Sequence, residues 1–306
     1  MSSALVMMAT YNGIRFLEGQ IRSIEEQQFD KIDLLISDDG SSDGTLGYLA
    51  DLKQRWRKGK VRLLSGPGEG FAENYRHLIL NSPAGQGIYA FADQDDEWMP
   101  EKLTEAAAWL QSQEPGIPAL YCARTQTVDE GGRLSGMSPL FTRPPSFRNA
   151  IVQSIAGANT MVFNQAARDL LAESCKRTHF VSHDWWAYLL VSGAGGRVFY
   201  SPVPRVHYRQ HSSNLVGANT SWRARMARLV LMAGGRFAKW NDMNLKALAS
   251  CSDLLCDDAR DVVLEFRRIR DGRFLDRLSR LRSSGIHRQT ALGQMSLYVA
   301  CMLAKI

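Results

Sequence analysis

The sequence lacks any long hydrophobic run. None of its apolar segments reaches the roughly 18 to 20 residues that cross a bilayer as a helix. Residues 1–10 also lack the basic flank and the small-residue cleavage site of a secretory signal peptide. We therefore expect a soluble, cytoplasmic protein.

Cysteine is scarce and follows no ligand or disulfide pattern. The chain has five cysteines, an odd number, and no two of them form a Cys-x-x-Cys pair. This argues against a disulfide framework and against a cysteine-bound zinc site. We expect buried, reduced thiols at Cys122, Cys175, Cys251, Cys256 and Cys301.

Charge is distributed unevenly over the 306 residues. The net charge is +6, but residues 219–306 hold sixteen Lys and Arg against eight Asp and Glu, which leaves the preceding residues slightly acidic. With 45% hydrophobic residues, the chain can bury a sizeable core. We expect two parts with different surfaces, residues 1–217 and a basic helical tail at residues 218–306.

Short apolar runs alternate with amphipathic stretches in the first half of the chain. The apolar runs predict buried strands at residues 4–9, 34–37, 61–65 and 88–92. Helices are expected between and after them at residues 14–27, 45–57, 72–81 and 100–111, the last with Pro100 at its first position. This alternation is typical of an α/β sheet with largely parallel strands.

The second half shows a weaker pattern. After a loop at residues 131–145 we expect a less regular region with a helix at residues 183–192 and strands at residues 197–200 and 205–209. From residue 222 onward the pattern is helical throughout.

Polar residues follow three of the expected strands. Ligands of parallel α/β sheets bind at the carboxyl ends of the strands, so one cleft can collect all three clusters. The clusters are Thr10-Tyr11-Asn12-Gly13, Asp38-Asp39-Gly40-Ser41-Ser42-Asp43 and Asp93-Gln94-Asp95-Asp96.

The third cluster sets the carboxylates of Asp93, Asp95 and Asp96 close together. Their mutual repulsion is costly unless a cation neutralises it, and a hard ion such as Mg²⁺ or Mn²⁺ prefers oxygen ligands. An aspartate after a strand can instead simply cap the next helix. The second cluster can likewise form a plain turn, or its carboxylate can accept the imide N–H of a pyrimidine base.

Together with Trp98, Pro100 and Lys102, the three clusters resemble glycosyltransferase family 2 in order, spacing and strand context. The resemblance covers roughly residues 4–217. It implies the GT-A fold, an α/β Rossmann-like nucleotide-binding domain, here followed by a C-terminal helical region. It also implies a nucleoside diphosphate sugar as the donor substrate.

The resemblance further implies a role for each cluster. In the family, the first strand end and the Asp-Asp-Gly-Ser turn hold the base and the ribose, and the Asp-x-Asp element binds the ribose and the metal. Asp93 is thereby assigned to the ribose and Asp95 to Mg²⁺ or Mn²⁺, with Asp93 and Asp96 as further candidate ligands. The residues assigned to the nucleotide are Thr10, Tyr11, Asn12, Asp38 and Asp39.

Two later stretches, residues 182–186 (Ser-His-Asp-Trp-Trp) and 208–211 (Tyr-Arg-Gln-His), resemble the rhamnosyltransferase-like branch of the family. Asp184 matches the general base that takes the proton of the acceptor hydroxyl, a role that is compatible with capping the next helix. His211 matches a further metal ligand. Arg209 matches a group that neutralises diphosphate charge.

Residues 66–76 match the Gly-rich turn of the family only in part. A dinucleotide fingerprint, Gly-x-Gly-x-x-Gly, needs its third glycine at the position of Phe71. A nicotinamide oxidoreductase is therefore disfavoured.

The tail contains a basic and aromatic amphipathic stretch at residues 222–232, followed by Arg236, Phe237, Lys239 and Trp240. This composition suits the headgroup region of an anionic bilayer and favours peripheral contact with the inner membrane surface. The alternative is a helical subdomain that packs on the first part of the chain. No recognised nucleic-acid fold is present, so no nucleic acid partner is expected.

The resemblance implies a metal-dependent, inverting hexosyltransferase. The expected reaction moves L-rhamnose from dTDP-L-rhamnose onto a hydroxyl of a glycan or glycolipid acceptor, a cell-surface precursor such as lipopolysaccharide core or O-antigen. One alternative is a family 2 transferase with a UDP-hexose or UDP-N-acetylhexosamine donor. An alternative of another class is a non-catalytic nucleotide-sugar-binding protein.

Overall fold

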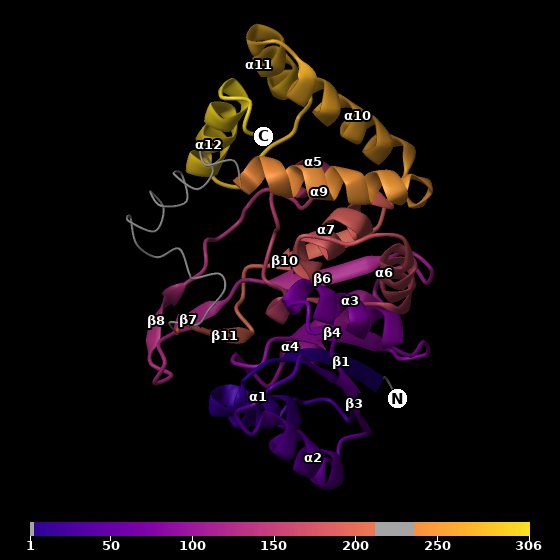
Figure 1. Ribbon diagram of the computed structural model, residues 1–306, viewed down its shortest axis with the longest axis vertical. Coiled ribbons are helices and arrows are strands. Elements are labelled where there is room, and N and C mark those ends of the chain that lie inside the picture. Colours follow the sequence, from indigo (N-terminus) through magenta and orange to yellow (C-terminus); the bar gives the residue numbers. More distant parts are fainter. Residues whose placement is uncertain (1–2, 212–235) are drawn as a thin grey trace.

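The computed structural model describes residues 3–211 and 236–306. In these residues a seven-stranded sheet and a four-stranded sheet are combined with helices (Figure 1). The amphipathic stretch at residues 222–232, for which membrane contact was expected, lies outside the described residues.

The first half of the chain alternates strands and helices as expected. Its elements are β1 (Ser3–Thr10), α1 (Ile14–Glu25), β2 (Lys31–Asp38), α2 (Thr45–Arg55), β3 (Val61–Ser65), α3 (Phe71–Asn81), β4 (Ile88–Ala92), β5 (Glu97–Trp98), α4 (Lys102–Gln111) and β6 (Ala119–Ala123). Pro100 does not occupy the first position of α4, because the helix begins two residues later.

The second half is more regular than the sequence indicated. After β7 (Gln126–Val128) and β8 (Leu134–Met137) come α5 (Phe147–Ala150), a short 3₁₀ helix (Ala158–Thr160), β9 (Val162–Phe163), α6 (Gln165–Arg177), α7 (His183–Gly193), β10 (Arg197–Ser201) and β11 (Val206–Arg209). The C-terminal helices are α9 (Arg236–Ser250), a 3₁₀ turn (Ser252–Leu254), α10 (Asp257–Asp271), α11 (Phe274–Ser283) and α12 (Ala291–Met302).

The large sheet has the strand order β10-β6-β9-β4-β1-β2-β3. β1 pairs in parallel with both β2 and β4, and β2 pairs in parallel with β3. The two-residue strand β9 runs antiparallel between β4 and β6. Because β1, β2 and β4 run in the same direction, the three polar clusters that follow them meet at one edge of the sheet.

Side chains of the central strands alternate between two apolar layers. On one face, Val6 and Ile36 pack with α1, α2 and α4. On the other, Met7 and Phe91 pack with α3, α6 and α7. Figure 1 shows these layers, with α1 and α2 on one side of the sheet and α3, α6 and α7 on the other.

The apolar layer above α7 continues into the C-terminal helices. Phe237, Leu248 and Phe266 are buried in the same cluster as Met7. None of the helices in the described part of the chain is long and apolar enough to span a membrane. Four of the five thiols are buried, whereas Cys256 is only half-buried, contrary to the expectation.

A small four-stranded sheet positions the residues after β11 beside the third polar cluster. Its strand order is β5-β11-β7-β8, with β11 antiparallel to β5 and parallel to β7. The pairing of β11 with β5 directly after the third polar cluster brings residues 209–211 back to residues 95–97.

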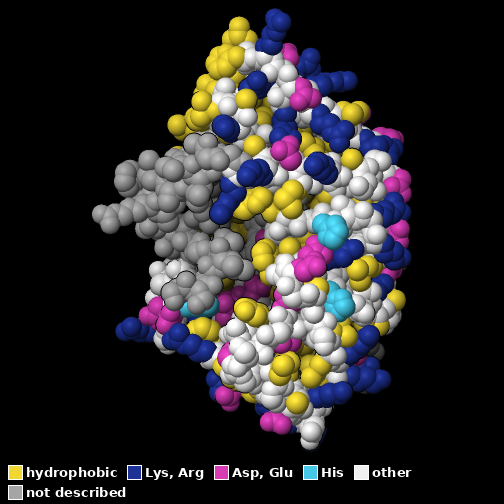
Figure 2. Space-filling view, viewed as in Figure 1, with side chains coloured by type: hydrophobic (Ala, Val, Ile, Leu, Met, Phe, Trp, Pro, Cys, Tyr) yellow, Lys and Arg dark blue, Asp and Glu magenta, His cyan; other side chains and the backbone are white. Residues whose placement is uncertain are grey.

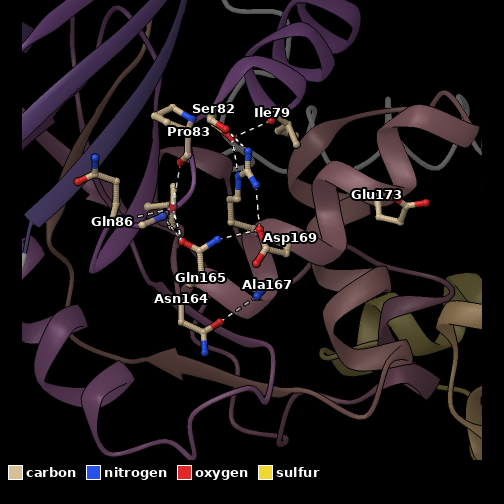
Figure 3. Close-up of polar contacts among 12 residues, drawn as sticks. Ile79, Ser82, Pro83, Gln86, Asn164, Gln165, Ala167, Asp169 and Glu173 are labelled. Atoms are coloured by element: carbon tan, nitrogen blue, oxygen red, sulfur yellow. Dashed lines mark hydrogen bonds and ion pairs between the residues drawn. The ribbon is translucent and has the colours of Figure 1, made fainter.

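The amino-terminal edge of the large sheet is held by polar contacts at the start of α6 (Figure 3). The Asn164 side chain caps the helix by accepting from the Ala167 N–H at 3.0 Å. Gln165 accepts from the Tyr89 hydroxyl at 2.5 Å, and Arg168 donates to the Ser82 hydroxyl at 2.9 Å. These bonds fix α6 against the end of α3, far from the edge where the three clusters meet.

Candidate functional site at the carboxyl ends of the strands

Asp38 forms the centre of the turn after β2. Its carboxylate accepts from the Thr10 hydroxyl at 2.8 Å, from the Ser41 hydroxyl at 2.6 Å and from the Ser41 N–H at 2.8 Å. The side chains of Thr10 and Asp38 are both buried. The first two polar clusters are therefore joined into one rigid unit at the strand ends.

Asn12 and Tyr11 continue this unit toward the third cluster. Asn12 lies at a positive φ of 48° and accepts from the Ser42 N–H at 2.8 Å. Gln94 pairs with the backbone of Tyr11, accepting from its N–H at 2.9 Å and donating to its carbonyl at 3.0 Å. The Tyr11 ring is 59% exposed, so it is open to a ligand.

Asp39 connects the turn to the Gly-rich segment before α3. Its carboxylate accepts from the Gly68 N–H at 2.7 Å and from the Gly70 N–H at 3.1 Å. Both glycines have positive φ, which explains why glycine stands at these positions. The partial Gly-rich match is thus a backbone cradle for an aspartate.

Asp93 lies in the interior of the site. The Tyr75 hydroxyl donates to its carboxylate at 3.0 Å. Burial, together with the charge of Asp95, raises the pKa of Asp93 to about 7, and the Tyr75 bond opposes the shift. The charge of Asp184 also raises this pKa, which ties the third cluster electrostatically to α7.

Asp96 is buried beside a buried lysine. Asn159 donates to one carboxylate oxygen of Asp96, and the Arg209 N–H donates to the other at 3.0 Å. Burial raises the pKa of Asp96 well above its ordinary value, and the charge of Asp95 adds to this. Lys102 lies over the Trp98 ring and donates to the Asn159 carbonyl at 2.6 Å, and burial lowers its pKa.

Asp95 and His211 meet from different parts of the chain. The Oδ2 of Asp95 lies 2.7 Å from the Nε2 of His211, which follows β11. The His211 ring packs on Phe16 with ring centroids 4.9 Å apart. The two side chains expected to bind a metal therefore lie side by side at the carboxyl edge of the large sheet.

Arg209 lies behind this pair. Its guanidinium contacts Glu97 at 2.5 Å and donates to the carbonyls of Asp95 and Glu130 at 3.2 and 2.9 Å. The side chain is nearly buried. In this position Arg209 braces the loop that carries Asp95.

Asp184 lies in the first turn of α7, near enough to Asp93 for its charge to raise the pKa of that carboxyl. Ser154 donates to its carboxylate at 3.4 Å. Burial raises the pKa of Asp184, and hydrogen bonds from Ser182 and the Trp185 backbone oppose the shift. A carboxylate with a raised pKa is a stronger base than an ordinary aspartate, which suits proton abstraction from an alcohol.

His183 connects Asp184 to Tyr75. Its ring stacks on the Tyr75 ring at 3.4 Å between centroids and meets Phe91 edge to face at 5.0 Å. Both ring nitrogens are buried and have no hydrogen bond to any other described residue. Burial lowers the pKa of His183 to about 3, so the imidazole is neutral near pH 7.

The structure thus gathers all the expected site residues around one edge of the sheet, and it adds several that the sequence did not indicate. The sequence assigned no role to Tyr75, Gln94, Asn159 and His183, although Gln94 and His183 stand within quoted motifs, because their contacts in the site are with residues distant in the sequence. Among residues 3–211 and 236–306, no group of three His, Cys, Asp or Glu side chains is arranged to hold a metal ion.

The mostly parallel sheet, its strand-end acidic residues and the added C-terminal helices define the class of GT-A glycosyltransferases. The family model described as glycosyl transferase family 2 matches residues 5–171, more than half of the chain. The chain therefore belongs to glycosyl transferase family 2, and the predicted family and fold class are confirmed.

Similar proteins agree with this assignment. The dTDP-rhamnosyl transferase RfbG of Shigella flexneri is 27% identical over 265 residues, which are 82% of this chain and 86% of that protein. S. aureus TarS 1-349 in complex with UDP-GlcNAc has a TM-score of 0.53 at 14% identity, covering 99% of this chain and 91% of that one. The mannosyltransferase PcManGT of Pyrobaculum calidifontis, in complex with GDP-Man and Mn2+, has a TM-score of 0.50 at 15% identity over 99% and 85%.

Proposed function

We propose that this transferase moves L-rhamnose from dTDP-L-rhamnose onto a hydroxyl of a cell-surface glycan precursor, with inversion at the anomeric carbon. The observation that carries the proposal is that the charges of both Asp95 and Asp184 raise the pKa of Asp93, so all three carboxylates lie close together, with His211 2.7 Å from Asp95. The rhamnose donor is supported by the similarity to RfbG over most of both chains.

The nucleotide would lie over the unit formed by Thr10, Tyr11, Asn12, Asp38 and Asp39. Because the Asp38 and Asp39 carboxylates already accept several hydrogen bonds, they mainly hold the shape of the strand-end turns. The exposed Tyr11 ring offers a surface for the base or ribose, and Asp93 faces the ribose. Turns that are already held by hydrogen bonds lower the ordering cost of binding.

Asp95 and His211 offer an oxygen and a nitrogen ligand that fit Mg²⁺ or Mn²⁺, with Asp93 and Asp96 as further candidates. When bound, the ion would neutralise negative charge on the departing nucleoside diphosphate. Arg209 would hold the Asp95 loop in place and add positive charge behind it.

In the transfer step, Asp184 accepts the proton of the acceptor hydroxyl as that oxygen forms a bond to the anomeric carbon. The bond from this carbon to the diphosphate oxygen breaks, and its electron pair leaves with dTDP. Ser154 and Ser182 orient the Asp184 carboxylate through hydrogen bonds. We place this reaction at the cytoplasmic face of the membrane, where a lipid-linked glycan acceptor would be available.

A UDP-hexose or UDP-N-acetylhexosamine donor is the second candidate, favoured by the fold similarity to TarS bound to UDP-GlcNAc. Turnover of a donor panel, dTDP-L-rhamnose, UDP-glucose, UDP-GlcNAc and GDP-mannose, separates the two. We expect dTDP-L-rhamnose to be consumed fastest. Donor binding by calorimetry without any turnover would instead indicate a non-catalytic binding protein.

Asp184→Asn tests the base. We expect kcat to fall by about 10²- to 10⁴-fold with donor affinity unchanged. In the parent, the raised pKa of Asp184 should place the acidic limb of the pH–rate profile above the usual range of an aspartate, since activity is lost as the base is protonated. Asp169→Asn, at the far edge of the sheet, is the control. Parent-like turnover by Asp184→Asn would contradict the assignment.

A further inference from the structure

The outward face of α12 is apolar although it is exposed. The helix has no charged residue along its length, and its inner side is buried through Leu297, Ala300 and Cys301. A surface helix normally turns polar residues outward, and one that is apolar all round normally has both sides covered. The outer residues, which we call the α12 stripe, are between 38% and 64% exposed: Leu292, Met295, Val299, Met302 and Leu303.

The α12 stripe is one continuous feature. From Leu292 to Met302 its residues follow one another at helical spacings of three and four, and Leu303, directly after the helix, lies four positions after Val299. These spacings place their side chains on the same side of the helix. Phe274 and Leu275, in the first turn of the neighbouring α11, are also exposed. Figure 2 shows hydrophobic side chains along the upper left margin of the molecule, over α11 and α12. Exposed apolar patches of this kind mark interaction surfaces.

The surroundings of the stripe are strongly basic. Residues 272–306 contain six Lys and Arg and a single acidic residue, Asp276, which pairs with Arg280. In the described parts of the chain, the side chains of Arg273, Arg282 and Lys305 have no ion pair or hydrogen bond, and all three are exposed. Arg282 also lines an open groove between α11 and α12.

We propose that the α12 stripe docks this protein on an anionic lipid bilayer. The apolar side chains enter the boundary between headgroups and acyl chains, and Arg273, Arg282 and Lys305 contact lipid phosphates. A second copy of the chain fits this face less well, because a symmetric dimer would bring two basic rims together. Figure 1 shows α12 on the same side of the molecule as β7, β8 and β11.

This docking is separate from the transfer reaction and can be measured without a donor. The experiment is cosedimentation of the full chain with vesicles of phosphatidylcholine containing about one third phosphatidylglycerol, and with vesicles of phosphatidylcholine alone. We expect binding to the anionic vesicles that weakens with salt. Equal pelleting with and without vesicles, or no preference for the anionic lipid, would overturn the proposal.

Met295→Glu places a charge in the middle of the stripe and should reduce vesicle binding by about tenfold or more. Leu46→Glu, at a similarly exposed leucine of α2, is the matched control and should bind like the parent. Arg282→Gln should remove part of the anionic preference, and it keeps the test valid if Met295→Glu folds poorly. Donor hydrolysis by Met295→Glu should be unchanged, so failure of docking and failure of the proposed function are distinguishable.

Two results would contradict bilayer docking directly. One is parent-like pelleting by both Met295→Glu and Arg282→Gln. The other is a lipid-free dimer of the parent that becomes monomeric in Met295→Glu by analytical ultracentrifugation, since that would assign the stripe to a second copy of the chain.

Discussion

Acidic residues have opposite environments in two regions of the molecule. At the carboxyl edge of the large sheet, burial raises the pKa of Asp93, Asp96 and Asp184. On the outer helices, hydrogen bonds from arginines lower the pKa of Asp253 and Asp258.

The direction of each pKa shift indicates whether the aspartate contributes to the stability of the fold. An aspartate whose pKa is lowered by an arginine stabilises the fold above its titration range, whereas one whose pKa is raised by burial destabilises the charged folded state. The strand-end carboxylates therefore oppose stability in the unliganded protein. We propose that binding of a cation or a substrate offsets this loss of stability.

The largest expected effect comes from Asp95→Asn, which removes one of the three carboxylate charges of Asp93, Asp95 and Asp96. We expect kcat to fall by about 10³-fold or more, because the substitution would break the proposed metal pair of Asp95 and His211. Unfolding free energy should stay the same or rise, since the charge that raises the pKa of Asp93 and Asp96 is gone.

Steady-state kinetics, Mn²⁺ binding by electron paramagnetic resonance and urea denaturation measure the three quantities. Asp258→Asn serves as the control that removes an aspartate charge elsewhere. Retained Mn²⁺ affinity and turnover in Asp95→Asn would show that this carboxylate does not hold the ion.

Lys102→Met should have an intermediate effect on stability. The substitution removes the buried lysine that interacts with Asp96 and Asp93 and leaves the Asn159 carbonyl without its donor, at a cost of about 3 kcal/mol. Lys176→Met removes an exposed lysine and should change the unfolding free energy by less than about 0.5 kcal/mol. Equal urea midpoints for the two variants would mean that Lys102 does not compensate the buried acids.

Asp258→Asn should have the smallest effect. Its two-bond contact with Arg148 joins α10 to α5, but the Asp258 side chain is mostly exposed to solvent. We expect a loss of less than about 1 kcal/mol, which decreases further at high salt. A loss as large as that of Lys102→Met would erase the contrast between the two regions.

The first half of the fold was predictable because its strands and helices show clear hydrophobic periods. The predicted strand at residues 61–65 and the end of the helix at residue 81 agree with β3 and α3. Periodicity could not reveal β9, because two residues carry no repeat and the strand is held by pairing with β4 and β6. β5 is equally short and depends on β11, which lies about a hundred residues later.

The sequence predicted the site residues that belong to a family motif. It did not predict contacts that arise only from the packing of distant segments. Asp95 and His211 stood in quoted motifs, and they lie 2.7 Å apart although 116 positions separate them. The stack of His183 on Tyr75 joins α7 to α3, and the bond from Asn159 to Asp96 joins the 3₁₀ helix to the acidic loop. Neither contact has a sequence signal, since each depends on how the sheet brings distant segments together.

The apolar cluster that includes Leu5 in β1 also includes Ile306, which is 2% exposed. A cluster that joins such distant parts of the chain closes large loops and forms slowly. During synthesis the first strands emerge long before the C-terminal helices, so this cluster is complete only after residue 306 has left the ribosome. Chaperone binding to the nascent chain should therefore persist through translation of the C-terminal helices.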